Sequence, residues 1–395
     1  MSKFGSVLLL AVAVAIAQVP GNARAQQINI PTGVFVALRG PDVGKGISSY
    51  ENKHTVWAHN PLDGRLYSVG GDFISQIGGP DSYEQEQYSL SLFDRWNDKA
   101  NQNAGWRLEY PYCGPNGGIQ PKSPDFIGWT WDSNRRVFWA VPGTFVIPVA
   151  QVCSDRTVAT SDDPKYKYRH LMTYNPSEPD LTKRWTDWGQ DTTPWRGENF
   201  MSVYDPVTDT IVRFTGDSTQ VADIYDVKTR AWSSVRYGPN AVGGTVRIPE
   251  MLSPDFVARV IYVIDGTAGR LMRWNIDQKT LSDLGAVPDG PVTPISNAYT
   301  VWDSVNRVLL FFHFNTGRLH VYHPDTKAWE SPAVVTEPAG LRPEVRHAMV
   351  FDPYQNVMAM LGNTNAGNNY IYLYRYANGS GAPAAPSAPT NLQVQ

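Results

Sequence analysis

The stretch "HAMVFDPYQNVMAMLGN" (residues 347–363) contains the pattern that decides the fold. An apolar run is broken at Asp352-Pro353, a second apolar run follows, and the pattern ends at Gly362. Asp-Pro favours a turn, and two short apolar runs joined by a turn predict an antiparallel hairpin. Arg346 and His347 stand at the head of the first run. The stretch therefore also raises the question of whether the strand entry carries a site.

The same pattern occurs in five other segments, namely residues 55–71, 127–143, 200–216, 250–266 and 298–314. The first three copies start about 72 residues apart, and the later ones about 50. After its glycine, a copy continues with a third apolar strand and a short fourth strand carrying Trp or Leu (Trp106, Trp185, Trp232, Leu281, Trp329). Periods of this length with four strands each are typical of β-propellers. The sequence predicts an all-β, six-bladed propeller of four-stranded antiparallel blades, with seven blades as the less favoured alternative.

The sixth copy lacks a fourth strand of its own. After "YIYLYRY" (370–376) the chain continues into a Gly/Ser/Pro/Ala-rich linker. The segment "TGVFVALRG" (32–40) is a spare strand near the N-terminus. Pairing it into the sixth blade would close the ring and leave no long exposed edge there.

The copies resemble Kelch repeats of the galactose-oxidase-like propeller type. The stretches "VRHAMVFDPYQNVMAMLGN" with "YIYLYRY", and "GRLYSVGGD" (64–72), carry this resemblance, which covers roughly residues 28–376. The chain departs from the family pattern because Gly70-Gly71 is its one Gly-Gly doublet at the blade position. The resemblance implies that each first strand lines a central channel. It also implies that the strand heads and the loops between second and third strands open on one face, and it specifies no activity.

Both ends of the chain lie outside the predicted propeller (26–376). Residues 1–25 have a basic start, an apolar run too short to span a bilayer comfortably and an "ARA" cleavage site, which predict a signal peptide. An N-terminal membrane anchor is the alternative. We therefore expect a secreted, extracellular protein without a membrane span after signal removal, with periplasm or cell surface as alternatives. Residues 377–395 are a linker whose last ten residues resemble the first strand of a fibronectin type III module. Either the sequence is a fragment of a longer protein, or this tail is a linker remnant.

Composition limits the partners and cofactors. The net charge of −3 gives no global attraction to nucleic acid or anionic membranes. The two cysteines, Cys113 and Cys153, allow one disulfide, which an oxidising destination favours over two free thiols. They are too few for a zinc site, and no nearby histidine spacing completes one. No cofactor or metal is predicted, because no catalytic or metal motif is present.

Candidate ligand-binding residues follow from aligning the copies on their turns. The heads of the inner strands carry mixed charges and amides, and converging polar groups at a channel mouth are typical of a ligand site. Trp195 precedes an inner strand beside Arg196 and could stack on a sugar ring. The candidate set is Lys53, His54, Asp125, Trp195, Glu198, Asn199, Arg247, Asn297, Arg346 and His347.

Each candidate has a structural alternative. Arg346 could bond backbone between blades, His347 could be a buried or capping histidine, and His54 could also be structural. The aromatic residues that recur at one register of the inner strands are expected to form inter-blade core rather than a stacking platform. They are Trp57, Trp131, Tyr204, Trp302 and Phe351.

The predicted function is binding of an extracellular glycan or protein through this face, by a monomer. The alternative is a carbohydrate-active enzyme, a polysaccharide lyase or hydrolase, that uses groups at the same mouth, and the candidates are Tyr50, His54, His170, Glu198 and Arg346. No catalytic residue can be assigned from the sequence, so whether the protein is an enzyme stays open. A purely structural surface protein is the third class.

Ring closure makes a direct prediction about stability. Deleting residues 28–40 removes the strand that would complete the sixth blade, so we expect a sharp fall in the melting temperature. Thermal unfolding followed by circular dichroism measures it. An unchanged melt would exclude closure by this segment.

Overall fold

The computed structural model describes most of the chain between residues 27 and 377. The described ranges are 27–40, 56–69, 87–110, 120–122, 128–141, 147–149, 170–193, 200–215, 221–236, 252–266, 268–292, 298–313, 315–343, 348–363 and 369–377.

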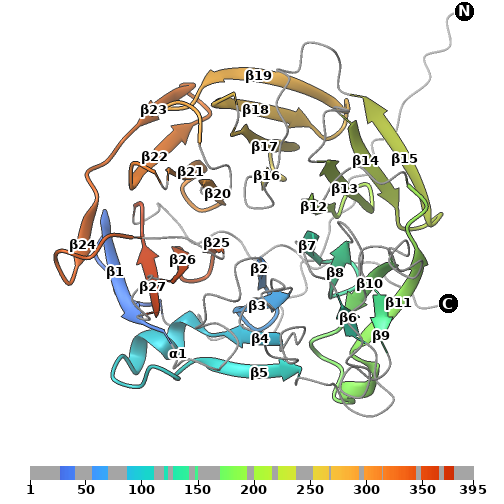
Figure 1. Cartoon of the computed structure of the whole chain (residues 1–395), viewed down its shortest axis with the longest axis horizontal. Coiled ribbons are helices and arrows are strands. Elements are labelled where there is room, and N and C mark those ends of the chain that lie inside the picture. Colours follow the sequence, from blue (N-terminus) through green and yellow to red (C-terminus); the bar gives the residue numbers. More distant parts are fainter. Residues whose placement is uncertain are drawn as a thin grey trace, which may run out of the picture.

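Six antiparallel sheets stand around a central axis, which confirms the predicted six-bladed β-propeller (Figure 1). Each repeated hairpin supplies the two inner strands of one blade, and the blades are numbered 1 to 6 in chain order. The innermost strands are β2 (Val56–Asn60), β7 (Gly128–Asp132), β12 (Phe200–Asp205), β16 (Leu252–Asp255), β20 (Ala298–Asp303) and β25 (Ala348–Asp352).

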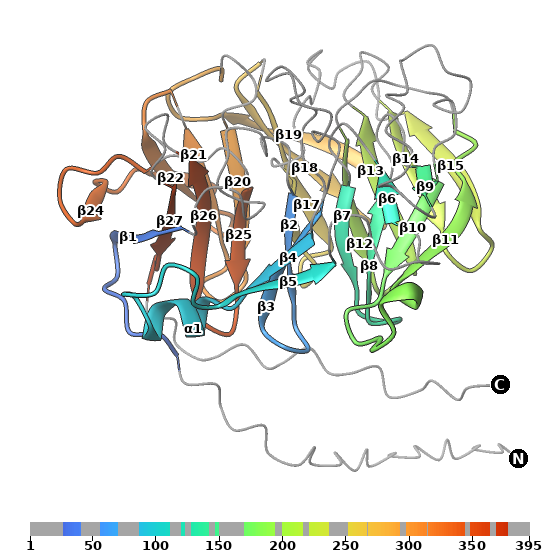
Figure 2. The ribbon, with the colours of Figure 1, turned by 60° about the horizontal axis from the view of Figure 1, so that its bottom comes forward.

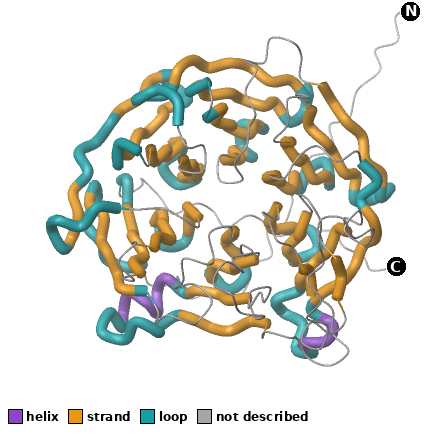
Figure 3. Tube along the Cα trace, in the orientation of Figure 1, coloured by secondary structure: helices purple, strands orange, loops and turns teal. Residues whose placement is uncertain are grey.

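The remaining strands follow outward in sequence order, and strands dominate the trace (Figure 3). Blade 1 adds β3 (Arg65–Val69), β4 (Gln87–Leu90) and β5 (Trp106–Tyr110), and blade 2 adds β8 (Val137–Val141), β10 (His170–Tyr174) and β11 (Trp185–Gln190). Blade 3 adds β13 (Thr210–Thr215), β14 (Val221–Asp226) and β15 (Ala231–Arg236), and blade 4 adds β17 (Val260–Asp265), β18 (Arg270–Asn275) and β19 (Thr280–Ala286). Blade 5 adds β21 (Val308–His313), β22 (Arg318–His323) and β23 (Ala328–Glu330), and blade 6 adds β26 (Val357–Asn363) and β27 (Asn369–Tyr374). A separate ribbon pairs β6 (Gln120–Lys122) with β9 (Ile147–Val149), and a 3-10 turn, η3 (Leu181–Lys183), precedes β11.

The two faces of the ring differ in which ends of the inner strands they carry. The inner strands begin at one face, called here the entry face. The turns that follow them lie at the opposite face, called the turn face, where the hairpin between β2 and β3 is seen beside helix α1 (Leu92–Asn97) in Figure 2. Because successive strands are antiparallel, the second strand of each blade ends, and the third begins, at the entry face.

The N-terminal strand closes the ring as predicted. Strand β1 (Val34–Arg39) pairs antiparallel with β27, with Phe35 opposite Tyr374 and Leu38 opposite Ile371. A further strand, β24 (Val335–Glu337), pairs parallel with the outer edge of β1 and makes this sheet five-stranded. The sequence analysis did not predict β24, because three residues are too short for a periodicity signal.

Two buried arginines hold the closing segment in place. The Arg375 guanidinium donates to the carbonyl oxygens of Ile28 (2.7 Å), Ile30 (3.2 Å), Gln355 (3.0 Å) and Asn356 (3.3 Å). It therefore joins the N-terminal segment to the first turn of blade 6. Arg95 in α1 donates to the carbonyl of Arg39 at the other end of β1 (2.6 Å).

One predicted element is wrong in part. The apolar segment "YSLSLFDRW" (88–96) reads as the third strand of the first copy, but the strand ends at Leu90 and α1 follows. Ser91 caps this helix, since its hydroxyl accepts the backbone N–H of Asp94 (3.2 Å). A serine before a helix and an acidic residue in its first turn both favour the helical start over continued strand.

The core lies mainly between adjacent blades. Of the aromatic residues expected there, Trp57, Tyr204, Trp302 and Phe351 are buried, and Trp131 packs at the edge of such a cluster. The inter-blade core reading is therefore confirmed. No helix within the described ranges is long and apolar enough to cross a membrane.

Acidic residues at the turn face tie the blades together. Asn60 or an Asp ends each inner strand and accepts a backbone N–H from its own turn (Asn60, Asp132, Asp205, Asp255, Asp303, Asp352). Three arginines add charged bonds to a neighbouring blade: Arg135 to Asp209 of the next blade (2.6 Å), Arg259 to Asp205 of the preceding blade (2.5 Å) and Arg307 to Asp255 of the preceding blade (2.9 Å). The turn signal read from the sequence is thus also a connector between blades.

The seam between blades 6 and 1 has a different chemistry. His59 Nε2 lies 3.5 Å from Asp352 Oδ1, and both side chains are buried. Burial lowers the pKa of His59 to about 3 and raises the pKa of Asp352 to about 7. Both groups are therefore uncharged between these pH values, whereas the Arg–Asp seams are ionic.

Replacing Arg375 tests the anchor of the closing strand. Arg375→Met keeps much of the side-chain length but leaves four backbone carbonyls without this donor. We expect the free energy of unfolding to fall by about 3 kcal/mol, measured by chemical denaturation. Arg236→Met, at an exposed position on β15, is the control and should change little. Equal stability of the two variants would contradict the anchoring role.

Asp352 predicts a pH dependence of stability. Its pKa is raised by burial on folding, so its contribution is full below about pH 4 and is lost as the pH rises through about 7, by about 4 kcal/mol in total. His59 has the opposite pH dependence, because its lowered pKa gives stability that grows as the pH rises from about 3. The Asp352 contribution is therefore measured as the difference in unfolding free energy between wild type and Asp352→Asn from pH 4 to 8, and this difference should change by about 4 kcal/mol. Asp205→Asn is a control of opposite sign, since burial raises the pKa of Asp205 but the Arg259 hydrogen bonds outweigh it and hold it low. A parallel pH profile for wild type and Asp352→Asn would contradict the assignment.

Candidate functional site

The ten predicted ligand-binding residues lie outside the described residues: Lys53, His54, Asp125, Trp195, Glu198, Asn199, Arg247, Asn297, Arg346 and His347. The same holds for Cys113 and Cys153, and for Tyr50 of the enzyme alternative. Of the enzyme candidates, His170 alone is described. Its Nδ1 lies 3.0 Å from both carboxylate oxygens of Asp187 on the neighbouring strand. This histidine is therefore engaged within blade 2.

Two buried side chains at the entry face have polar atoms without any hydrogen-bond partner. Gln87 at the start of β4 is 4% exposed, and neither its amide oxygen nor its amide nitrogen is paired. His313 at the end of β21 is 2% exposed, and neither ring nitrogen is paired. Buried polar groups are nearly always paired in folded proteins. These two positions are therefore the most informative described residues for ligand binding.

The position of His313 is set by its strand. It pairs with Ala298 of the inner strand, one residue after the predicted Asn297, and with Arg318 of the third strand. Along β21 its side chain follows that of Phe311, which belongs to the core between blades 4 and 5. His313 therefore faces this seam, at the entry end.

A second histidine of the same seam is fully paired. His320 on β22 places Nε2 3.1 Å from Asp289 Oδ2 and Nδ1 2.8 Å from the Ser331 hydroxyl. Asp289 also accepts from Thr316 Oγ1 (2.8 Å) and from Arg318 (3.0 Å). Burial is the main cause that lowers the pKa of His320, and Asp289 only partly opposes it. His320 is therefore a neutral imidazole at pH 7.

A tight loop holds Asp289 over the seam. Val287 and Val292 are buried on either side of it, and they donate backbone bonds to Gly269 and Gly266 of blade 4 (2.9 Å each). A Cβ at Gly269 would lie 2.8 Å from backbone atoms of this loop, so the close approach requires glycine. Burial opposes ionisation of Asp289, but Thr316, His320 and Arg318 together hold its pKa below the usual value. The loop thus presents a carboxylate to blade 5.

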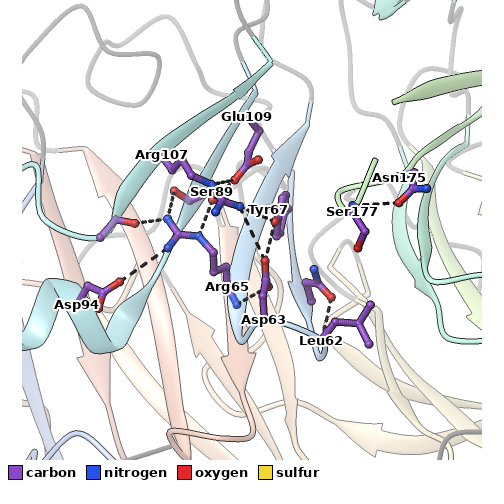
Figure 4. Close-up of polar contacts among 12 residues, drawn as sticks. Leu62, Asp63, Arg65, Tyr67, Ser89, Asp94, Arg107, Glu109, Asn175 and Ser177 are labelled. Carbon is purple, nitrogen blue, oxygen red and sulfur yellow. Dashed lines mark hydrogen bonds and ion pairs between the residues drawn. The ribbon is translucent and has the colours of Figure 1, made fainter. Parts of the chain in front are cut away.

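Two other polar clusters between blades are held together by hydrogen bonds within the scaffold. In the cluster of Figure 4, the buried Glu109 carboxylate accepts from Ser89, from Arg107 (2.5 Å) and from Arg184 of blade 2 (3.3 Å). Arg65 donates to the Ser89 hydroxyl (2.7 Å). Both oxygens of the Glu109 carboxylate accept hydrogen bonds, so this cluster joins blades 1 and 2 as part of the scaffold.

The buried Arg213 makes a similar junction between blades 2 and 3. It donates to Asp191 (2.7 Å), Thr193 (2.6 Å) and Asp223 (3.0 Å), and its guanidinium lies 4.4 Å from the Trp232 ring. Both carboxylates are themselves fully buried. This arrangement is the ionic counterpart of the histidine seam between blades 4 and 5.

Four residues of these polar sites were not predicted from the sequence, namely Gln87, His313, His320 and Asp289. A histidine at the last position of a predicted second strand could have drawn attention to His313, because the register places it beside the head of the inner strand. The contact from Asp289 to His320 spans 31 residues and depends on the loop, so no local signal marks it. Among the residues that the structure describes, no group of three or more His, Cys, Asp or Glu side chains could hold a metal ion.

Comparisons with known proteins show no close relationship. No family model matches the chain, and no curated protein matches it either. A nidogen/laminin complex structure matches with a TM-score of 0.42 at 11% identity, over 73% of this chain and 93% of that chain. A streptogramin B lyase structure matches with a TM-score of 0.41 at 11% identity, over 88% and 95%. Likeness at this level carries no argument about ligand or activity.

Proposed function

We propose that this propeller is a binding protein that recognises a glycan or protein ligand through its entry face. The observation that carries the proposal is the pair of buried side chains at that face, Gln87 and His313, whose polar atoms have no partner among the described residues. A buried polar group left unpaired costs about 1–3 kcal/mol. A bound ligand that supplies hydrogen bonds would remove this cost.

The two side chains also indicate the chemistry of the ligand. The two ring nitrogens of an imidazole and the oxygen and nitrogen of a primary amide are all hydrogen-bonding atoms. Sugar hydroxyls and peptide groups can satisfy donors and acceptors together, whereas a simple ion cannot. This matches the predicted glycan or protein ligand.

The remaining sequence expectations belong to the same proposal. The candidate residues predicted from the strand heads, among them Lys53 and His347, and the aromatic Trp195 would complete the site around the channel mouth. The proposal also includes the other expectations from the sequence: a relationship to Kelch-type propellers, secretion, a disulfide, a fibronectin-like tail and a monomeric state. Of the residues named for the lyase or hydrolase alternative, His170 alone is described, and its contact is with Asp187 in its own blade.

Shape-conserving variants test the proposal. Gln87→Met and His313→Phe remove the polar atoms but keep the bulk. We expect each to weaken binding at least about tenfold, equivalent to the loss of one good hydrogen bond, on ligands found with glycan and protein arrays and measured by calorimetry. His323→Phe, on β22 at the turn face, is the matched control and should bind as wild type does.

Stability measurements separate a binding role from a structural one. If Gln87 and His313 await a ligand, the apolar variants should be as stable as wild type or more stable, because an unpaired buried polar group has been removed. Unchanged affinity in both variants, or the absence of any array ligand, would contradict the proposal.

A further inference from the structure

We propose that Ser331, His320 and Asp289 form a nucleophile, base and positioning carboxylate that hydrolyse carboxylic esters at the outer end of the seam between blades 4 and 5. This activity goes beyond ligand binding at the channel mouth and uses a nucleophile on the outside of blade 5.

The geometry is that of an activated hydroxyl. Ser331 follows the outermost strand β23 and is exposed, while His320 is 1% exposed. The Ser331 hydroxyl lies 2.8 Å from His320 Nδ1, and the opposite nitrogen, Nε2, lies 3.1 Å from Asp289 Oδ2. A hydroxyl, an imidazole and a carboxylate bonded in this order are the arrangement that activates serine nucleophiles on unrelated folds.

The tautomer follows from the carboxylate. Asp289 is held ionised by Thr316 and Arg318, so it accepts the proton of His320 Nε2. Nδ1 is then the unprotonated nitrogen and accepts the Ser331 hydroxyl proton. The exposed hydroxyl is the group that meets a substrate, and the buried imidazole is shielded from competing water.

Blade 3 has a serine and a carboxylate at the corresponding positions, but no histidine. Asp223 on β14 pairs in register with Ser234 on β15, and the Ser234 hydroxyl donates to Asp223 Oδ1 (2.6 Å). His320 and Ser331 occupy the corresponding positions of blade 5, since the neighbouring residues Val321 and Glu330 are paired there. The Asp223 carboxylate is ion-paired with Arg213, and it bonds the Ser234 hydroxyl directly, with no imidazole between them. The two seams therefore differ in the one group that general-base catalysis requires.

The reaction balances with water as the second substrate. The Ser331 oxygen attacks the acyl carbon while its proton passes to His320 Nδ1, and the carbonyl electrons move to the acyl oxygen. The tetrahedral species collapses, the ester C–O bond breaks, and His320 gives the proton to the leaving alcohol. Water then attacks the acyl-serine with His320 as base, and the products are the acid and free Ser331. Asp289 stabilises the imidazolium in both halves and acts as a positioning residue.

A fluorophosphonate probe and p-nitrophenyl acetate test the proposal on the full chain. We expect the probe to modify Ser331, located by peptide mass spectrometry, and the ester to give a burst followed by slow turnover. Ser331→Ala should abolish both. His320→Gln, which keeps a hydrogen-bonding side chain, should slow labelling at least about 100-fold. Circular dichroism melting checks that each variant is folded.

The positioning role of Asp289 and the internal control need separate readouts. Wild-type labelling should rise with pH along the titration of one group, and Asp289→Asn should shift that pH profile as well as lower the rate. Ser234→Ala should leave labelling at Ser331 unchanged, and Ser234 itself should stay unmodified. Labelling of Ser331 no faster than that of Ser234, or unaffected by His320→Gln in a folded variant, would overturn the proposal and leave the chain of bonds as a junction between blades.

Discussion

The whole ring depends on one insertion, that of β1 between β27 and β24. A propeller blade buries its faces only against its two neighbours, so an incomplete sixth blade would weaken the seams on both sides of it. Hydrogen bonds along both edges of β1 and the four carbonyl bonds of Arg375 make this strand part of blade 6. The N-terminal segment is therefore a structural member of the ring, although it is far from blade 6 in sequence.

The seams between blades follow a common plan with one important variation. Their middles are apolar, and their turn-face ends are tied by Asp, Asn and Arg side chains. At the entry face, Gln87 and His313 have buried polar atoms that the scaffold leaves unpaired. In the seam between blades 4 and 5 the imidazole of His320 is bonded to Asp289, whereas in the seam between blades 2 and 3 the Arg213 guanidinium is bonded to Asp191. We therefore expect function at the places where the scaffold leaves polar atoms unpaired or positions an imidazole beside a hydroxyl.

The inner hairpins and the closing strand could be predicted from the sequence because their signals are local. Alternating apolar runs and Asp-containing turns mark each hairpin, and "TGVFVALRG" reads as a strand without a partner. Helix α1 was missed because Ser91 interrupts an apolar run whose strand propensity dominates it. The seam site was missed because Asp289 and His320 come together only through a loop held by Gly269. The strand register places His313 at the entry face, but it does not predict that the ring nitrogens of His313 are left unpaired.

The position of β1 has a consequence for how the chain is assembled. Arg375 and Ile28, whose contact fixes the closing segment, are 347 residues apart. Strand β1 can therefore pair with β27 only after the strands of all six blades have been synthesised, and contacts of such long range form late. Until then β27 and β1 each offer an unpaired edge. Two chains at high concentration could satisfy both edges by exchanging β1, so the same geometry that seals the monomer also provides a route to a domain-swapped dimer.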